Sequence, residues 1–412
     1  MIIHNIGELC TLAGGVRMGS DAMNEIGLQK NAGIVIVGGR IEEIGPSDRV
    51  LRSWSGDIET RINAGGRAAV PGLVDCHTHA VFASDRAHEF EARMQGKSYK
   101  EVLDEGGGIL YTTRVTRDST RAELLKALLQ RLDRMMDHGT TTVEVKSGYG
   151  LETHAELRLL EVMEAALERH PIDIVPTFMG AHAVPQEFKD AEAYSRYVVE
   201  DMLPKCAPLA SFIDVFCEQG VFDVDQSRRI LEAGHEAGLG VKVHADELSA
   251  SGGGRLAAEL GAVSAEHLLH TPSDVLEEML DEGVIPVLLP AAAFNLGDGE
   301  YADASAMMDA GAPVALATDF NPNCFTESLP FVMALACRGM GMSPAEALSA
   351  TTVNAAAALG MEEEVGSLEP GRKGDVLILD ASSHVHLPYH MGVNVTWKVV
   401  KEGTLAVDLG HR

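Results

Sequence analysis

The chain has 412 residues, 46% of them hydrophobic, and a formal net charge of −28. Its length and apolar content support one large core with room for a smaller second domain, and its acidity excludes nucleic acid and anionic membranes as favoured partners. It has no apolar run of about 18 residues, which excludes a membrane span, and its first residues lack the features of a signal peptide. We therefore expect a cytoplasmic protein, in keeping with six scattered cysteines that form no CxxC pair.

Both ends of the chain have the pattern of β structure. The segment AGIVIVGGRIEEIGP, residues 32–46, is typical of a hairpin with a Gly-Gly turn. Near the other end, GDVLILDASS and WKVVKEGTLAV are also rich in strand-forming residues. Because each end is too short to bury a core alone, we expect residues 1–66 and 365–412 to pair into one small β-sandwich-like domain.

Residues 67–364 alternate between short apolar runs and amphipathic helical segments, which predicts parallel strands joined by helices. The apolar runs are PGLVDCHTH, TTTVEVKSGYG, DIVPTFMGAH, SFIDVFCEQG, GVKVHADE, AVSAEHLL, GVIPVLLPAAAF and PVALATDFNP. Eight such units are what a TIM (β/α)8 barrel of the α/β class requires. The rival fold, a doubly wound open sheet, needs a Gly-rich phosphate turn or a switch-point site, and neither is present.

Polar residues gather where these predicted strands end. They are His77 and His79, His182, His244 and Glu247, Glu266 and His267, and Asp319 and Asn321. In a TIM barrel these ends form one face, which carries the chemistry. Residues i and i+2 of a strand point the same way, so His77 and His79 can reach one ion. With the imidazole of His244 and the carboxylate of Asp319, they make a ligand set suited to zinc or iron rather than calcium or magnesium.

Each residue taken alone also has a structural explanation. Asp319 is a common type of turn residue, and Glu247 suits the first turn of a helix. Their ordered occurrence at the ends of the first, fifth, sixth and eighth runs favours a metal site over several coincidences.

The motifs HTH, HADE, EH and TD stand at the ends of four of these runs. In this ordered set of motifs the chain resembles the mononuclear-metal branch of the amidohydrolase superfamily. Within that branch it is similar to the imidazolonepropionase family. The resemblance covers essentially the whole chain and rests on PGLVDCHTHAVFASDRAHEF, KSGYGL, FMGAHAVP, DVFCEQGVF, HADE and ATDFNP.

The resemblance implies one divalent metal ion, Zn2+ or Fe2+/Fe3+, held by His77, His79, His244 and Asp319. It implies substrate binding by Arg86, Tyr149, His182, Glu247 and Asn321. The implied reaction opens the ring of 4-imidazolone-5-propanoate to N-formimino-L-glutamate, in histidine degradation, by attack of metal-bound hydroxide on the ring carbonyl. Relatives also suggest a homodimer.

Two positions depart from this family pattern. After DFNP the family often has Gly and then Ser or Thr, whereas this chain has Asn323 and Cys324. We expect both residues to contact the substrate. The contact of Asn323 should differ from the backbone contact of the family's glycine, and that of Cys324 from the contact of the family's hydroxyl group.

For the chemistry, Glu247 is expected to take a proton from water and deliver it to the leaving ring nitrogen. His267 is expected to stabilise the oxyanion, and Asp319 to orient the water. The forked guanidinium of Arg86 suits the propanoate carboxylate. Without the resemblance, an ordinary surface salt bridge of Arg86 with Asp85 or Glu89 is the better interpretation.

Three alternatives stay open. A deaminase of a purine, pyrimidine or related ring would use the same metal site and release ammonia. A non-catalytic scaffold on the same barrel would lack a ligand or the glutamate, and neither is missing. Lys146 invites a carbamate-bridged pair of metals, but it ends the second run rather than the fourth, so we expect a single metal and a loop-ordering lysine.

Overall fold

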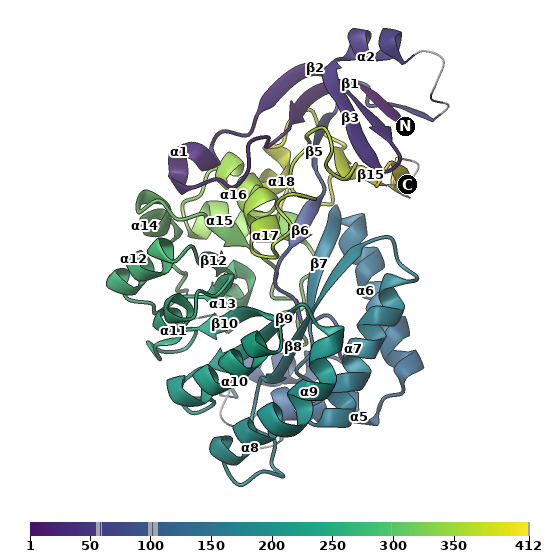
Figure 1. The fold of residues 1–412 in the computed structure, drawn as a ribbon. Coiled ribbons are helices and arrows are strands. Elements are labelled where there is room, and N and C mark those ends of the chain that lie inside the picture. The colour runs from purple at the N-terminus through teal and green to yellow at the C-terminus, as the bar shows by residue number, and fades with distance from the viewer. Residues whose placement is uncertain (55–57, 59, 98–100, 102–105, 298, 411–412) are drawn as a thin grey trace.

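The computed structural model describes residues 1–412 except 55–57, 59, 98–100, 102–105, 298 and 411–412. Its central element is a sheet of eight parallel strands that follow one another in chain order (Figure 1). The strands are β6 (Leu73–Asp75), β7 (Thr140–Lys146), β8 (Asp173–Ala181), β9 (Phe212–Cys217), β10 (Gly240–Ala245), β11 (Ser264–His267), β12 (Ile285–Leu288) and β13 (Ala315–Leu316). Each lies within one of the eight predicted apolar runs, which confirms the barrel.

The first and last strands of this sheet meet and close the barrel. Thr78 and Phe320, just beyond β6 and β13, form an isolated parallel bridge. Below that bridge the buried carboxylate of Asp75 accepts hydrogen bonds from the N–H and the hydroxyl of Thr318, at 3.1 and 2.7 Å. Closure brings the two ends of the barrel sequence, and the polar residues that follow them, to one place.

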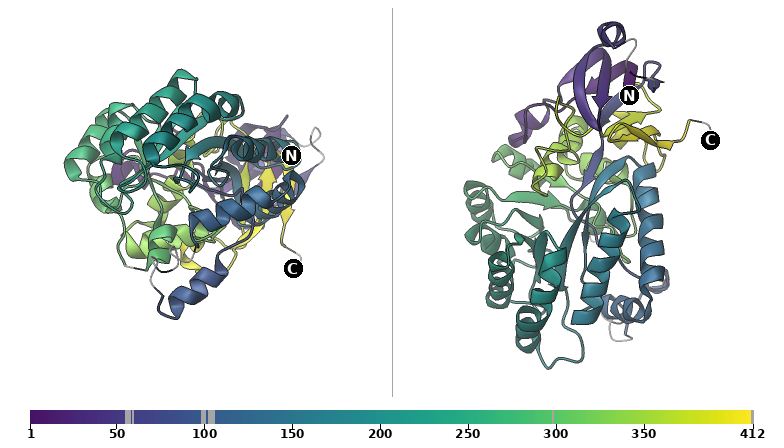
Figure 2. Two further views of the ribbon diagram at one scale, coloured as in Figure 1. Left: turned by 90° about the horizontal axis from the view of Figure 1, so that it is seen from below. Right: turned by 45° about the vertical axis from the view of Figure 1, so that its right-hand side comes forward.

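Helices cover the outside of the barrel (Figure 2). They are α3 (Ala87–Met94), α5 (Ile109–Asp118), α6 (Arg121–Asp137), α7 (Thr153–Leu167), α8 (Ala191–Tyr197), η1 (Val198–Met202), α9 (Leu203–Cys206), η2 (Ala207–Leu209), α10 (Val224–Glu236), α11 (Gly253–Glu259), α12 (Ser273–Asp281), α13 (Pro290–Leu296), α14 (Ala304–Asp309), α15 (Leu329–Gly339), α16 (Pro344–Ala350) and α17 (Val353–Ala357). The helix that directly precedes β7 is α6, which starts at a capping box formed by Thr120 and Glu123. Its apolar face, including Leu128 and Leu132, is fully buried, as the amphipathic pattern predicts.

A second sheet combines both ends of the chain. Its strands are β1 (Ile2–Cys10), β2 (Leu28–Val37), β3 (Arg40–Pro46), β4 (Arg61–Asn63), β5 (Ala68–Pro71), β14 (Val376–Leu379), β15 (Thr396–Lys401) and β16 (Thr404–Asp408). β5 joins the two halves, because it pairs with β1 on one side and with β14 on the other. Figure 2 shows these N-terminal and C-terminal strands, purple and yellow, together at one end of the molecule. The small helices α1 (Gly19–Met23), α2 (Ser47–Ser53) and α18 (His386–Tyr389) complete the described elements outside the barrel.

Gly72 is the link between the two sheets, since it separates β5 from β6. A Cβ atom there would lie 2.1 Å from the Oγ1 atom of Thr141, a distance that only glycine avoids. The chain can therefore pass directly from the small sheet into the barrel. Among the described residues, no helix is long and apolar enough to cross a bilayer.

Candidate active site

A cavity of about 340 Å3 opens at the carboxyl ends of the barrel strands. It is lined by His79, Arg86, Arg93, Ile109, Tyr149, His182, Phe216, His244, Glu247, Leu248, His267, Ala292, Leu296, Asp319, Asn321, Asn323 and Cys324. Every sequence-predicted site residue lines this cavity except His77, which is fully buried beside it. Residues that are distant in sequence thus share one space, as expected for the active face of a TIM barrel.

The four predicted metal ligands lie close together. The Nε2 atoms of His79 and His244 are 3.3 Å apart. The Oδ1 atom of Asp319 lies 3.5 Å from His77 Nε2 and 3.6 Å from His79 Nε2. Ligand atoms about 2.1 Å from one tetrahedral cation lie about 3.4 Å from one another, so these separations fit a shared ion.

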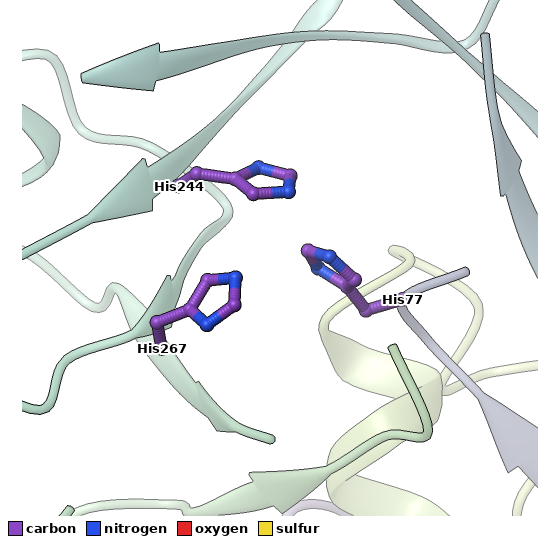
Figure 3. A group of neighbouring side chains, drawn as sticks. All are labelled: His77, His244 and His267. Atoms are coloured by element: carbon purple, nitrogen blue, oxygen red, sulfur yellow. The ribbon is translucent and has the colours of Figure 1, made fainter. Parts of the chain in front are cut away.

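His77 has the clearest signature of a missing partner. Both of its ring nitrogens are buried, and neither has a hydrogen-bond partner among the described residues. A buried imidazole without partners is costly, and a cation would satisfy it. Figure 3 shows His77, His244 and His267 turning their rings toward one another from three different parts of the barrel.

Two overlapping groups of this kind can hold a metal ion. One consists of His77, His79 and Asp319, and the other of His77, His244 and His267. In each group the ligand atoms lie within 4.8 Å of one another. The residues present therefore fit a metal cofactor. His79 and Asp319 share one group with His77, and His244 and His267 share the other with it.

The electrostatics of the site favour neutral imidazoles, which is the form that binds metals. Burial, together with neighbouring cations, lowers the pKa of His77, His79 and His267 well below the usual value. Burial has the same tendency at His244, but the carboxylate of Asp214 outweighs it and raises the pKa of His244. Three of the four rings thus present lone pairs rather than positive charge.

Glu247 lines the same cavity and lies next to His267. Its Oε2 atom is 3.6 Å from His267 Nε2. Burial, followed by the negative charge of Asp319, raises the pKa of Glu247 to about 8. Burial also raises the pKa of Asp319 to about 6. A carboxyl group with a pKa near neutrality can both accept and donate a proton at physiological pH.

His182 and Tyr149 form an aromatic wall next to His79. The rings of His79 and His182 stack, with centroids 4.8 Å apart and planes inclined by 17°. The Nδ1 atom of His182 lies 3.0 Å from the carbonyl oxygen of Gly148, and since a carbonyl only accepts, Nδ1 carries the proton. Burial, with a smaller effect of His244, lowers the pKa of His182 to about 3, so its Nε2 atom is a neutral acceptor. The Tyr149 ring lies 5.3 Å from that of His182.

Arg86 is buried, with 5% of its surface exposed, which contradicts the surface salt-bridge interpretation. Its Nε–H donates to the hydroxyl of Thr112 at 3.0 Å. The neighbouring acids have other partners: Asp85 accepts from Ala87 N–H, and Glu89 accepts from Gly108 N–H. No residue within the described part of the chain forms an ion pair with Arg86, so a buried cation lines the cavity without a carboxylate.

The loop after Asp319 is organised by Asn321. The Oδ1 atom of Asn321 accepts the backbone N–H groups of Asn323 and Cys324, at 2.8 and 2.9 Å, and its Nδ2–H donates to the Asp319 carbonyl at 2.8 Å. The thiol of Cys324 points to the carbonyl oxygen of Thr318 at 3.7 Å. These three residues line the cavity, but the groups named here are already engaged in their own turn.

Sequence reasoning missed other residues of the cavity wall, such as Arg93 and Phe216. It also missed Asp214, a buried carboxylate 2.9 Å from His244 Nδ1. The signal was available, because a charged residue within the apolar run SFIDVFCEQG requires a buried partner. Lys146, expected to order a loop, lies instead fully buried inside the barrel and forms ion pairs with Glu144 and Asp214.

Comparison with known proteins places this geometry in a family. Residues 68–405 match the model of the amidohydrolase family. The chain is 51% identical over its whole length to the imidazolonepropionase of Symbiobacterium thermophilum, 98% of which is covered. It is 51% identical, over 93% of its length and 91% of the relative, to the imidazolonepropionase of Haloarcula marismortui.

Solved structures with the same fold are more distant. An adenosine deaminase from Xanthomonas campestris with bound zinc superposes with a TM-score of 0.72 at 16% identity, over 99% of this chain and 92% of the other. An N-isopropylammelide isopropylaminohydrolase from Burkholderia multivorans gives the same score at 20% identity, over 99% and 98%. These two likenesses bear on the fold alone. By its sequence relatives and its family match, the chain belongs to the amidohydrolase family and, within it, to the imidazolonepropionases.

Proposed function

We propose that this protein hydrolyses 4-imidazolone-5-propanoate to N-formimino-L-glutamate, a step of histidine degradation. The observation that carries the proposal is the composition of one cavity. It joins a group of side chains that could hold a metal ion, a carboxyl group with a pKa of about 8, and a buried arginine that has no carboxylate partner among the described residues. The similarity to relatives named imidazolonepropionase extends over the whole chain and supports this choice of substrate.

His77, His79, His244 and Asp319 are proposed to hold one divalent metal ion, zinc or iron. When bound, such an ion lowers the pKa of a water molecule and polarises a carbonyl group. The side chains favour these metals because imidazole and carboxylate ligands suit them better than they suit calcium or magnesium. Metal analysis of the purified protein distinguishes zinc from iron.

Arg86 is proposed to bind the propanoate carboxylate. A guanidinium can engage both oxygens of a carboxylate, and in this strongly acidic protein an anionic substrate needs a local positive charge. Tyr149 and His182 form a wall against which the flat imidazolone ring can lie. With the proton on Nδ1, the Nε2 atom of His182 is a hydrogen-bond acceptor, which suits a ring N–H group.

Glu247 is proposed to move the proton. Water adds its oxygen to the ring carbonyl carbon, the bond from that carbon to the ring nitrogen breaks, and the nitrogen needs a proton to leave. Glu247 takes that proton from the water and delivers it to the nitrogen. His267, which lies 3.6 Å from Glu247, is neutral and can donate a hydrogen bond to the carbonyl oxygen as negative charge develops there.

The experiment is incubation of the metal-loaded protein with 4-imidazolone-5-propanoate, with product analysis by NMR. We expect N-formimino-L-glutamate without ammonia. Release of ammonia would instead support the deaminase alternative, which no observation at this site favours over ring opening. The buried Arg86 is the discriminating feature, since it suits a substrate that bears a carboxylate.

We also propose that the protein acts in the cytoplasm and forms a homodimer. All six cysteines are free and five are buried, which suits a reducing compartment. Light scattering of the purified protein tests the dimer.

A further inference from the structure

The motif DVFCEQG has no role in the proposed reaction, yet it lies directly against the residues that do. Asp214 and Phe216 are alternate residues of β9, which pairs with the strand of His244, and Glu218 directly follows β9. Asp214 contacts His244, and Glu218 contacts the residue after Glu247. Phe216 lines the cavity, whereas Asp214 and Glu218 are buried to 2% exposure or less. Two carboxylates in such positions need partners. Besides the N–H of Gln219, which donates to Glu218, their partners lie on or just after the next strand or in the barrel interior.

Asp214 contacts His244 at two points. Its Oδ1 atom accepts the backbone N–H of His244 at 3.1 Å, and its Oδ2 atom lies 2.9 Å from His244 Nδ1. This second contact is an ion-pair contact and not an aligned hydrogen bond. The negative charge beside Nδ1 favours a proton on that nitrogen, which leaves the lone pair on Nε2. That Nε2 atom is the one that lies 3.3 Å from His79 Nε2 in the cluster of metal-binding side chains.

Lys146 pairs with this buried carboxylate, and Lys242 pairs with the two neighbouring glutamates. Lys146 Nζ lies 2.7 Å from Asp214 Oδ2 and 2.9 Å from Glu144 Oε2. Lys242 Nζ lies 3.2 Å from Glu144 Oε1 and 3.5 Å from Glu266 Oε1. Asp214, His244 and Glu266 could by spacing hold a further metal ion, but the two ammonium groups already supply the positive charge there. Asp214 is therefore free to act on His244 instead of on a second metal.

Glu218 fixes the chain just after Glu247. Its Oε2 atom accepts the backbone N–H of Leu248 at 2.9 Å, and its Oε1 atom accepts from the hydroxyl of Ser249. The chain after Glu247 is loosely packed here, because Leu248 is 55% exposed and a second cavity of about 520 Å3 is lined by Glu218, Ser249 and Ser251. The hydrogen bonds of Glu218 with Leu248 and Ser249 therefore help to fix the backbone that holds Glu247 at the cavity.

From this geometry we propose that Asp214 and Glu218 are positioning residues: Asp214 aims His244 at the metal, and Glu218 holds Glu247 in place for proton transfer. The roles of His244 and Glu247 rest on the proposed function. These two roles predict different defects. Substitution of Asp214 should weaken metal binding, and substitution of Glu218 should lower the turnover rate.

The first arm measures metal affinity of Asp214→Asn by competition with a chelator, using zinc. Both oxygens of Asp214 face N–H donors, so an asparagine NH2 group must oppose one of them and disturb His244. We expect zinc affinity to fall about 10- to 100-fold. Affinity within twofold of wild type would overturn the role of Asp214. This readout does not depend on the substrate, so it stands even if the proposed reaction fails.

The matched control for this arm is Asp375→Asn in the small sheet. Asp375 is also buried, pairs with Lys401 at 2.6 Å and accepts a backbone N–H from Glu402 at 2.8 Å. We expect a similar loss of thermal stability and unchanged zinc affinity. Should Asp214→Asn fail to fold, 15N NMR of the zinc-loaded wild type decides: a proton on Nδ1 of His244 supports the proposal, and a proton on Nε2 overturns it.

The second arm uses Glu218→Ala, with the exposed Glu232→Ala on α10 as its control. Displacement of a catalytic group by about 1 Å costs roughly 100-fold in rate. We expect kcat to fall by about that factor, with KM and zinc affinity within twofold of wild type. Amide hydrogen exchange of residues 246–251 should rise in Glu218→Ala and not in the control. Amide hydrogen exchange in Glu218→Ala that matches wild type would overturn the role of Glu218, and so would a loss of zinc affinity as large as the fall in kcat. The exchange measurement does not depend on the substrate.

Discussion

His77 and Asp319 lie at opposite ends of the barrel sequence, yet His77 Nε2 is 3.5 Å from Asp319 Oδ1. The backbone joins them as well, because the N–H of Asp319 donates to the carbonyl oxygen of His77 at 3.1 Å. These contacts form where the first and last strands close the barrel. The residues that close the barrel therefore also form part of the candidate metal site. A change at the metal site should alter the stability of the closed barrel.

Removal of the metal should therefore lower the stability of the whole barrel. Without a cation, the two buried ring nitrogens of His77 have no hydrogen-bond partner among the described residues. A ligand present at a concentration of 1,000 times its Kd stabilises the folded state by about 4 kcal/mol. We expect a clear fall in Tm after treatment with a chelator, reversed by zinc or ferrous ion. Scanning calorimetry measures it. Identical melting curves of metal-loaded and chelated protein, with metal loss verified, would contradict a shared site.

Arg86→Ala should weaken substrate binding far more than metal binding. Loss of a charge-assisted hydrogen bond costs about 1.5–3 kcal/mol, so KM should rise by about 10- to 100-fold while metal content stays at the wild-type level. The control is Arg255→Ala, which removes an exposed arginine paired with Asp274 and Glu278. Steady-state kinetics of both variants make the comparison, and an unchanged KM in Arg86→Ala would count against the carboxylate clamp.

Glu247→Gln should abolish proton transfer without emptying the metal site. The substitution keeps the shape of the side chain but removes the carboxyl group whose pKa lies near 8. We expect kcat to fall by about 10²- to 10⁴-fold, with bound metal unchanged by elemental analysis. A variant that retains near wild-type kcat would remove Glu247 from the mechanism.

The small sheet contains a pH-dependent contact that can be tested separately. Burial alone would raise the pKa of Glu8, but hydrogen bonds from His384, Lys30 and Ser383 outweigh it and lower the pKa to about 2. A depressed carboxyl pKa stabilises the fold above the unfolded value of 4.5, and this contribution is lost as pH falls toward 2. Glu8→Gln should therefore cost about 2 kcal/mol at pH 7.

The measurement is urea unfolding of wild type and Glu8→Gln between pH 7 and pH 2. The difference between their free energies of unfolding should shrink as the pH drops below 4.5. A difference that is constant over this range would show that the charge of Glu8 is not the source of the stability.

The sequence was sufficient to predict the barrel and the order of its polar residues. The eight apolar runs became eight strands, because each alternates with a helix whose apolar stripe must cover the sheet. The spacing of His77 and His79 placed both rings on one side of the chain, since the strand period is two. Their approach to Asp319 followed from closure of the barrel.

Other features depend on contacts that no sequence pattern encodes. Arg86 directly precedes α3, and its buried position depends on a contact with a distant helix, because its Nε–H donates to the hydroxyl of Thr112 on α5. Lys146 lies inside the barrel rather than in a loop because Glu144 and Asp214 turn inward beside it. From the sequence alone, Arg86 and Lys146 could equally be exposed at the surface or buried, because nothing in the local pattern distinguishes the two positions.

The most direct test of the central claim is a product spectrum. Metal-loaded protein should convert 4-imidazolone-5-propanoate to N-formimino-L-glutamate, seen by NMR, with no release of ammonia. Intact substrate after prolonged incubation with fully metal-loaded protein, or stoichiometric ammonia, would contradict the account.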